Sequence, residues 1–251
     1  MKRSKTKLTI AAVVVIVIAS CMHCCNRNAP TVKHPAPSEQ AAVGHTAVSE
    51  LVPLDIKLPR PMFTGHRSAN FRDLIPNLEP MSTKPRPSFL APVGTKNVAL
   101  GKPVTCSDED PIIGKLEMIT DGDKEAAEGS YVELGFSFLQ HVTIDLEAEY
   151  NIYAIVFWHY HSDTRAFFDV IVQAVDDPVF TTNVKTLFNN DHDNSAGFGI
   201  GKDKNYIETS EGKLIDAGGI RTRYIRLYSN GNDLDEFNRY IEVEVYGKAV
   251  K

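Results

Sequence analysis

The distribution of proline divides this chain into two parts that must fold differently. Eleven of its fourteen prolines lie between Pro30 and Pro92. Helices do not persist at that density, and sheets accept proline only at their edges. Residues 26–50 also lack any hydrophobic period. The sequence therefore predicts a proline-rich tether over residues 21–92, disordered in part, and a folded domain over residues 93–251.

The second half of the tether is more apolar than the first. Residues 51–54 and 61–63 carry apolar side chains, and so does Phe71. Two placements are open for this stretch, which either lies extended against the folded domain or floats free of it. A coil of about 70 residues spans roughly 45–50 Å, enough to lift a domain off a membrane surface.

The first twenty residues have the pattern of a secretion signal. Residues 2–7 are basic, and residues 8–20 form an uninterrupted run of uncharged, mostly apolar residues. As a helix this run would span about 20 Å, short of the ~30 Å hydrocarbon core of a bilayer. We therefore predict a signal peptide over residues 1–20 and not a membrane-spanning helix.

The end of that run resembles the lipobox of bacterial lipoproteins. Residues 18–21 read Ile-Ala-Ser-Cys, and in such lipoproteins the cysteine is diacylated and becomes the new N-terminus. The resemblance implies lipidation of Cys21 and a membrane-anchored lipoprotein of the cell envelope, at the outer membrane or the cell surface. Several acyl chains give stable anchoring where one is marginal.

Charge separates the first residues from the rest of the chain. The formal net charge is −5, but residues 1–20 hold four basic residues and no acidic one, so without them it becomes −9. Nucleic acids and anionic lipid surfaces require clustered Lys and Arg. We therefore expect no nucleic-acid partner.

From residue 97 onward, short apolar or alternating runs are separated by polar, glycine-rich loops. Apolar side chains alternate with polar ones in residues 142–146 and 240–245, and a further apolar run covers residues 167–175. A period of two is the signal of a strand with one buried face. We expect about seven or eight strands and an all-β fold, an antiparallel jelly-roll β-sandwich.

Five segments in order resemble discoidin domains, also called coagulation factor 5/8 type C domains, of the galactose-binding-like superfamily: residues 97–105, 119–123, 142–146, 223–227 and 241–247. The resemblance covers about residues 95–249 and implies a jelly roll that binds ligands on loops at one rim. The chain departs from the family at residues 136–141, where the usual tryptophan is missing. Its loop from Asn189 to Glu208 is also longer than in a minimal member.

The resemblance also implies a structural calcium ion. Many members hold one between the last strand and the turn that corresponds to residues 119–123 here. Carried over, the ligands are Asp121, Asp123 and Glu242. Gly122 permits a positive φ, so the two aspartates can converge, and Ca²⁺ takes six to eight oxygen ligands. Ala126 stands where the family often has Ser or Thr, which removes one oxygen. The alternative is a turn with solvated carboxylates.

The loops expected at the rim are rich in side chains that suit a sugar. A pyranose needs an apolar face, which Trp158 or Tyr160 could supply if either turns outward, and short polar groups that bind neighbouring hydroxyls. The predicted ligand-binding residues are His161, Arg165, Asp191, His192, Asp193, Asn194, Asn230, Asn232 and Asn238. The alternative is that these residues only build turns, with Arg165 and Asp191 as a structural pair.

Catalytic motifs are missing from the sequence. The glycine-rich residues 197–203 lack the spacing of a phosphate-binding loop, and no G-x-S-x-G elbow occurs. We therefore expect no enzyme but a surface module that binds a glycan or a cell-surface protein. The alternative is a structural or protein–protein interaction module of the cell envelope without a sugar site.

Overall fold

Strands form almost all of the regular structure in the computed structural model. It describes residues 50–62, 67–68, 70–82, 84–108, 110–135 and 139–250. The predicted signal peptide, the lipidation site Cys21 and the first part of the tether lie outside the described residues. Two short 3-10 helices, η1 (Phe71–Leu74) and η2 (Leu116–Thr120), accompany the strands. Within the described ranges, no helix has the length and apolar character needed to cross a membrane.

The strands form one large sheet and one small one. They are β1 (Leu51–Pro53), β2 (Leu90–Pro92), β3 (Lys96–Asn97), β4 (Val104–Cys106), β5 (Val132–Leu134), β6 (Gln140–His159), β7 (Ile171–Val175), β8 (Lys185–Asn189), β9 (Lys213–Ser229) and β10 (Asn238–Ala249). The eight-stranded sheet has the order β3-β10-β6-β9-β7-β8, with β4 on β6 and β5 on β10, while β1 pairs with β2. All these ladders are antiparallel.

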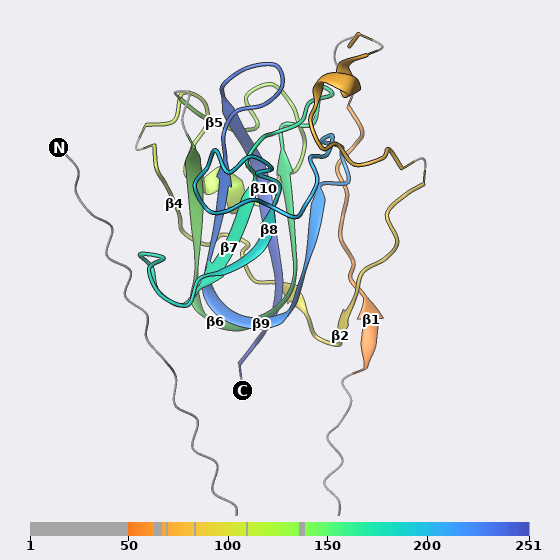
Figure 1. Ribbon diagram of the computed structural model, residues 1–251. Coiled ribbons are helices and arrows are strands. Elements are labelled where there is room, and N and C mark those ends of the chain that lie inside the picture. The colour runs from red at the N-terminus through yellow and green to blue at the C-terminus, as the bar shows by residue number, and fades with distance from the viewer. Residues whose placement is uncertain are drawn as a thin grey trace, which may run out of the picture. The chain divides into compact units, whose positions relative to one another are not determined.

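The large sheet closes into two layers because β6 and β9 are long and bend. Asp145 pairs with Tyr224 and Tyr150 pairs with Thr222, so four residues of β6 stand opposite one residue of β9. Glu147, within this bulge, has a φ of +64°. Extra residues in one strand bend it and increase its twist. Figure 1 shows the two strands curving at the same end of the domain.

Each long strand therefore contributes to both layers. One layer contains β4, the first half of β6, the second half of β9, β7 and β8. The other contains β3, β5, β10, the second half of β6 and the first half of β9. This arrangement confirms the predicted antiparallel jelly-roll β-sandwich.

The main hydrophobic core lies between the layers. It includes wholly buried aliphatic side chains from three long strands: Val142, Ile144, Ile155, Ile225, Leu227, Val243 and Val245. Each such side chain contributes about 1.5–3 kcal/mol when it is fully buried. The alternating runs of the sequence thus correspond to inward-facing positions of β6, β9 and β10.

A second apolar cluster covers the outer face of β6 and β10. At its centre Trp158 is wholly buried, and Leu54 and Phe89 of the segment before the sandwich pack against the cluster. The Trp158 Nε1 donates to the carbonyl oxygen of Ser210 (3.0 Å). The hypothesis that Trp158 turns outward to face a sugar is therefore wrong. The contacts of Leu54 and Phe89 show that these parts of the second half of the tether lie against the domain and do not float free.

Candidate ligand-binding site

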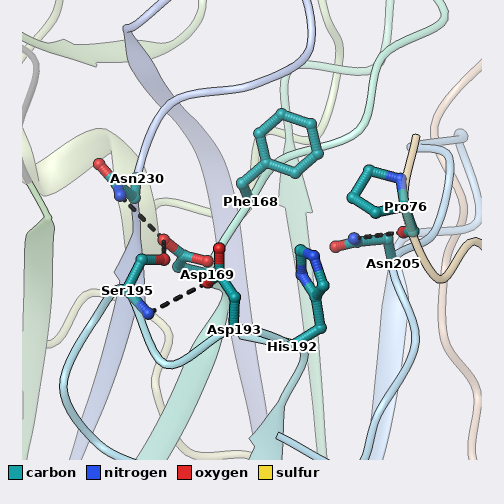
Figure 2. Close-up of a pocket in the computed structure, with 8 residues that line it drawn as sticks. All are labelled: Pro76, Phe168, Asp169, His192, Asp193, Ser195, Asn205 and Asn230. Carbon is teal, nitrogen blue, oxygen red and sulfur yellow. Dashed lines mark hydrogen bonds between the residues drawn. The ribbon is translucent and has the colours of Figure 1, made fainter. Parts of the chain in front are cut away.

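A pocket opens among the connections between strands, and its walls come from four separate stretches of chain (Figure 2). Its volume is about 320 Å³. The lining residues are Pro76, Phe168, Asp169, His192, Asp193, Ser195, Asn205 and Asn230. They belong to the segment before β2, the β6–β7 loop, the β8–β9 connection and the residue that follows β9. Because β6 and β9 bend back on themselves, both ends of each strand lie at the same end of the domain, which brings these distant residues together (Figure 1).

Three carboxylates converge at this pocket and are called the rim triad: Asp169, Asp191 and Asp193. One carboxylate oxygen of each residue lies within 4.8 Å of one oxygen of each of the other two. The Asp169 Oδ2 accepts hydrogen bonds from the Ser195 hydroxyl (2.9 Å) and from the Asn230 side-chain Nδ2 (2.8 Å). Both donors are neutral side chains.

The other two members of the rim triad organise the start of the β8–β9 connection. Asp191 is wholly buried and accepts the backbone N–H groups of Ser195 (3.1 Å) and Ala196 (2.9 Å). Hydrogen bonds from the Ser195 hydroxyl and backbone N–H lower the pKa of Asp193. Among the ion pairs formed by the described residues, none includes a member of the triad. Three oxygen donors so placed could hold a hard metal ion such as Ca²⁺.

On the opposite side of the pocket, the side-chain amide of Asn205 bonds the segment that carries Pro76. The Asn205 Nδ2 donates to the carbonyl oxygen of Pro76 (2.7 Å). Its Oδ1 is buried, has no hydrogen-bond partner among the described residues, and points to the side where His192 lies (Figure 2). A buried acceptor without a donor costs free energy. Phe168 and the Pro76 ring add apolar surface beside these polar groups.

The structure gathers part of the predicted ligand-binding set at this pocket. His192, Asp193 and Asn230 line it, and Asp191 supports it from behind. Asn194 lies in the same connection, where its Oδ1 accepts the Gly199 N–H (2.6 Å). His192, Asp193 and Asn194 all lie in the long β8–β9 connection, and Asn230 directly follows β9.

The lining of the pocket does not include His161, Arg165, Asn232 or Asn238. Arg165 is held by the carboxylates of Asp163 and Asp235, so the structural pair with Asp191 considered from the sequence is not formed. The Asn232 Nδ2 also donates to Asp235 (2.7 Å).

The other two side chains of this set are buried and bonded within the domain. Asn238 bonds the backbone N–H of Gly231 (2.8 Å) and the side chain of Gln140 (3.0 Å). The His161 Nε2 lies 3.0 Å from the carbonyl oxygen of Lys124. For both residues, a role in ligand binding stays a prediction.

Sequence reasoning missed Phe168 and Asp169 because the apolar run over residues 167–175 suggested a strand throughout. The strand β7 begins only at Ile171. Asp169 has a φ of +49°, a conformation that aspartate accepts more readily than most residues. An aspartate interrupting an apolar run was the available signal for a turn before the strand.

The predicted calcium ligands form the turn trio: Asp121, Asp123 and Glu242. Glu242 meets the turn as expected, because its Oε2 accepts the Gly122 N–H (3.1 Å). The two aspartates, however, accept backbone N–H groups within the turn, Asp121 from Asp123 (2.8 Å) and Asp123 from Glu125 (2.9 Å). Among the described residues, the carboxylates that come within 4.8 Å of one another as a group of three belong to the rim triad.

Glu242 itself is in an unusual electrostatic environment. It is wholly buried, and its Oε1 has no hydrogen-bond partner in the described part of the chain. Burial raises its pKa to about 9, although the hydrogen bond from Gly122 acts in the opposite direction. A carboxyl group buried in this way carries a proton at neutral pH unless a cation replaces that proton.

No family model matches this chain, and no curated protein matches it. Among solved structures, a family 89 glycoside hydrolase from Clostridium perfringens is 18% identical with a TM-score of 0.44, but the match covers 61% of this chain and only 15% of the hydrolase. The CpGH89CBM32-4 module of the same organism, in complex with GlcNAc-α-1,4-galactose, is 19% identical with a TM-score of 0.43, covering 62% of this chain and 96% of the module.

A fucose-binding module from Streptococcus pneumoniae is similar to the same extent. It is 16% identical with a TM-score of 0.41, and the match covers 60% of this chain and 97% of the module. These similarities concern the architecture of the β-sandwich and carry no conclusion about the ligand of this chain.

Proposed function

We propose that this protein is a binding module that recognises a neutral carbohydrate in the pocket beside the rim triad. The observation that carries the proposal is the pocket itself, where carboxylate, amide and hydroxyl groups from distant loops surround apolar side chains. Its volume of about 320 Å³ lies at the lower end of the range for small-ligand sites. A site of this size suits the end of a glycan better than the middle of a long chain.

The hydrogen-bonding groups of the pocket favour a ligand that donates. Asp169, Asp193 and the Asn205 Oδ1 all accept, while the Asn230 Nδ2 is already engaged with Asp169. Sugar hydroxyls can donate to such acceptors and also accept from other groups. Of the described residues that line the pocket, none is Lys or Arg, so an anionic sugar would place its charge beside unneutralised carboxylates. Neutral glycans are therefore the expected class.

A glycan array probed with the full chain, followed by calorimetry, tests this proposal. We expect binding to neutral glycans and none to uronic or sulfated ones. Asp193→Asn keeps an oxygen that can accept the Ser195 N–H (3.1 Å) but removes the charge. Losing a charged hydrogen bond to the ligand costs about 1.5–3 kcal/mol, or about 10- to 150-fold in affinity.

Asp177→Asn is the matched control for that variant. Asp177 also accepts backbone N–H groups near it in sequence, those of Val179 and Thr181, but lies in the β7–β8 connection. Its substitution should leave sugar affinity unchanged. If the array and calorimetry detect no sugar, the proposal fails, and a protein-interaction module of the cell envelope takes its place.

We also propose that the protein is anchored by lipid at Cys21, which the lipobox-like residues 18–21 support. Cys21→Ala should block processing and release the protein from the membrane fraction, as fractionation and acyl labelling would show. A variant that migrates and fractionates like the wild type would rule out the anchor.

A structural calcium ion at the turn trio is the remaining proposal. Its support is the buried Glu242 Oε1, which has no hydrogen-bond partner among the described residues and lies on a carboxyl group in contact with Gly122 of the turn. Oxygen donors of this kind suit Ca²⁺. The ion would place a positive charge in contact with the Glu242 carboxylate, whereas the nearby Lys124 pairs with Glu244 (2.7 Å). The calcium titration described below tests the assignment.

A further inference from the structure

The segment that precedes the sandwich runs beside the β8–β9 connection and forms part of the pocket. Leu78 and Asn205 form a parallel bridge. The Glu79 N–H donates to the Asn205 carbonyl oxygen (2.8 Å), and the Asn205 N–H donates to the carbonyl oxygen of Asn77 (3.1 Å). These bonds place Pro76 at the pocket wall. The wall therefore comes from a stretch that the sequence assigned to the tether.

Side-chain contacts hold this segment at two further places. The Lys213 Nζ lies 3.2 Å from the Glu79 carboxylate, and the Asn77 Nδ2 donates to the carbonyl oxygen of Asp203 (3.2 Å). Both partners belong to the β8–β9 connection or to the start of β9. The segment is thus fastened along the same loop that supplies His192 to the pocket.

Arg67 fastens the segment to a second loop. Its guanidinium pairs with the carboxylate of Asp233, and the two side chains are only 19% and 9% exposed. It also lies over the Phe71 ring, 4.6 Å from the centroid. Asp233 in turn accepts the backbone N–H of Ala166 (2.9 Å). The Arg67 side chain therefore links the segment to the loop after β9, outside the lining of the pocket.

Docking of the segment also orients the buried acceptor of the pocket. The Asn205 Nδ2 is engaged with the Pro76 carbonyl oxygen, and because an amide is planar, this bond fixes the direction of Oδ1. If the segment moved away, the Pro76 surface would be lost and the Asn205 amide would be free to rotate. One contact therefore sets both an apolar wall and a hydrogen-bond acceptor.

We propose that residues 67–68 and 70–79 form a specificity element whose docking and ligand binding stabilise each other. The inference rests on the proposed sugar function of the pocket. Arg67 is a positioning residue, since it acts through the segment and does not line the pocket. Coupling of this kind is reciprocal: a ligand that needs the Pro76 wall strengthens docking, and weaker docking lowers affinity for that ligand by the same factor.

Calorimetry on the full chain with four neutral probes, the methyl pyranosides of galactose, glucose, mannose and fucose, tests the coupling. For each pyranoside that the wild type binds, Arg67→Ala should lower the affinity about fivefold or more, within the usual range of coupling between sites. Arg67→Lys should restore part of the loss. Arg60→Ala is the matched control, because Arg60 pairs with Glu125 (3.4 Å) from an exposed position outside the pocket lining.

Hydrogen exchange supplies a readout that general loss of stability would not imitate. In the wild type, a bound pyranoside should slow exchange of the Glu79 and Asn205 amides. In Arg67→Ala these amides should exchange faster without ligand, while amides of the β6 core stay protected. If Arg67→Ala does not fold, Pro76→Ala carries the test, since it keeps the carbonyl that binds Asn205 and replaces the ring at the pocket wall with a methyl group and a backbone N–H. It should change the ranking of the four pyranosides.

The outcomes separate the two proposals. Suppose that the wild type binds a pyranoside and that Arg67→Ala and Pro76→Ala have the same affinities for the four probes as Arg60→Ala. The proposal of a specificity element is then wrong, and the sugar site stands. If the wild type binds none of the probes and no glycan on the array, both proposals fall together. Loss of affinity with faster exchange at Glu79 and Asn205 supports the coupling.

Discussion

Two groups of acidic residues in this molecule look alike in sequence and differ in structure. The aspartates of the turn trio accept backbone N–H groups two residues ahead of them, so their oxygens serve the turn itself. The rim triad draws its members from two different loops, and one hydroxyl group, that of Ser195, bonds Asp169 and approaches Asp191. Asp191 and Asp193 also accept nearby backbone N–H groups, so local bonds shape a turn in both groups. The difference is Asp169, a third aspartate that the fold brings to them from another loop, and this creates a polar site.

Asp191→Ala should have the largest effect on the rim triad. Asp191 accepts two backbone N–H groups from a wholly buried position, and removing acceptors for two donors costs about 3 kcal/mol. The loop that carries His192 and Asp193 would lose its support, so sugar binding should fall below detection. Chemical denaturation and calorimetry would measure the two effects.

Asp191→Asn is the corresponding control, because it keeps one of the two acceptor oxygens. It should fall between the wild type and the alanine variant in stability. An alanine variant with unchanged stability and affinity would show that the triad plays no part in organising the pocket.

Calcium should separate the two acidic groups. An ion bound only to the native state stabilises it by about 2.7 kcal/mol at a hundred times Kd. We expect millimolar calcium to raise the melting temperature above that in EDTA. Glu242→Gln should abolish the shift, because a glutamine beside Gly122 cannot release a proton to become a charged ligand. Asp193→Asn should leave the shift in place.

The reverse pattern would move the ion to the rim triad. A shift that survives Glu242→Gln and disappears in Asp193→Asn would assign calcium to the pocket. No shift in the wild type at any calcium concentration would remove calcium from both groups.

Arg165→Ala should have a smaller effect than either change. The Arg165 side chain is only 7% exposed, but its partners Asp163 and Asp235 are 22% and 31% exposed. Water can therefore solvate both carboxylates once the guanidinium is removed, so the loss of the ion pairs should cost about 1 kcal/mol. Arg239 also holds Asp235, which limits the loss further. Sugar affinity should change less than in Asp193→Asn when both variants are measured by calorimetry. A larger loss in Arg165→Ala would extend the binding site to the Asp163 side of the rim.

Acidification should lower stability through a residue that belongs to neither acidic group. Burial and the neighbouring Arg226 lower the pKa of His141 to about 4. Below its ordinary pKa near 6.5, the unfolded chain takes up a proton that the folded domain refuses, so stability declines as pH falls from about 6.5 to 4. The ring of His141 packs against Tyr228 with centroids 5.2 Å apart, and His141→Phe should keep that contact and flatten this part of the profile. An unchanged slope in thermal melts would exclude His141 as its source.

Local patterns predicted the architecture because strand alternation is a property of neighbouring residues. The apolar side chains of residues 142–146 and the valines of residues 240–245 lie in the main core, as the alternation predicts. Glu242 and Glu244, which alternate with those valines, are also buried, and the sequence pattern did not predict this. The contact between Gly122 and Glu242 was also expected, through a resemblance that follows from short motifs. Polar loops rich in Asp and Asn pointed to His192, Asp193 and Asn230, which line the pocket.

The sequence by itself determined that this chain forms a β-sandwich and which loops carry most of its polar groups. Only the tertiary structure decided which of those groups meet. It buries Trp158, pairs Arg165 with Asp235, and brings Pro76 to the pocket through Asn205. Backbone alternation depends on residues one or two positions apart, whereas a pocket wall depends on contacts across more than a hundred residues. Such contacts leave no period in the sequence, because each is fixed by how the layers and loops pack together.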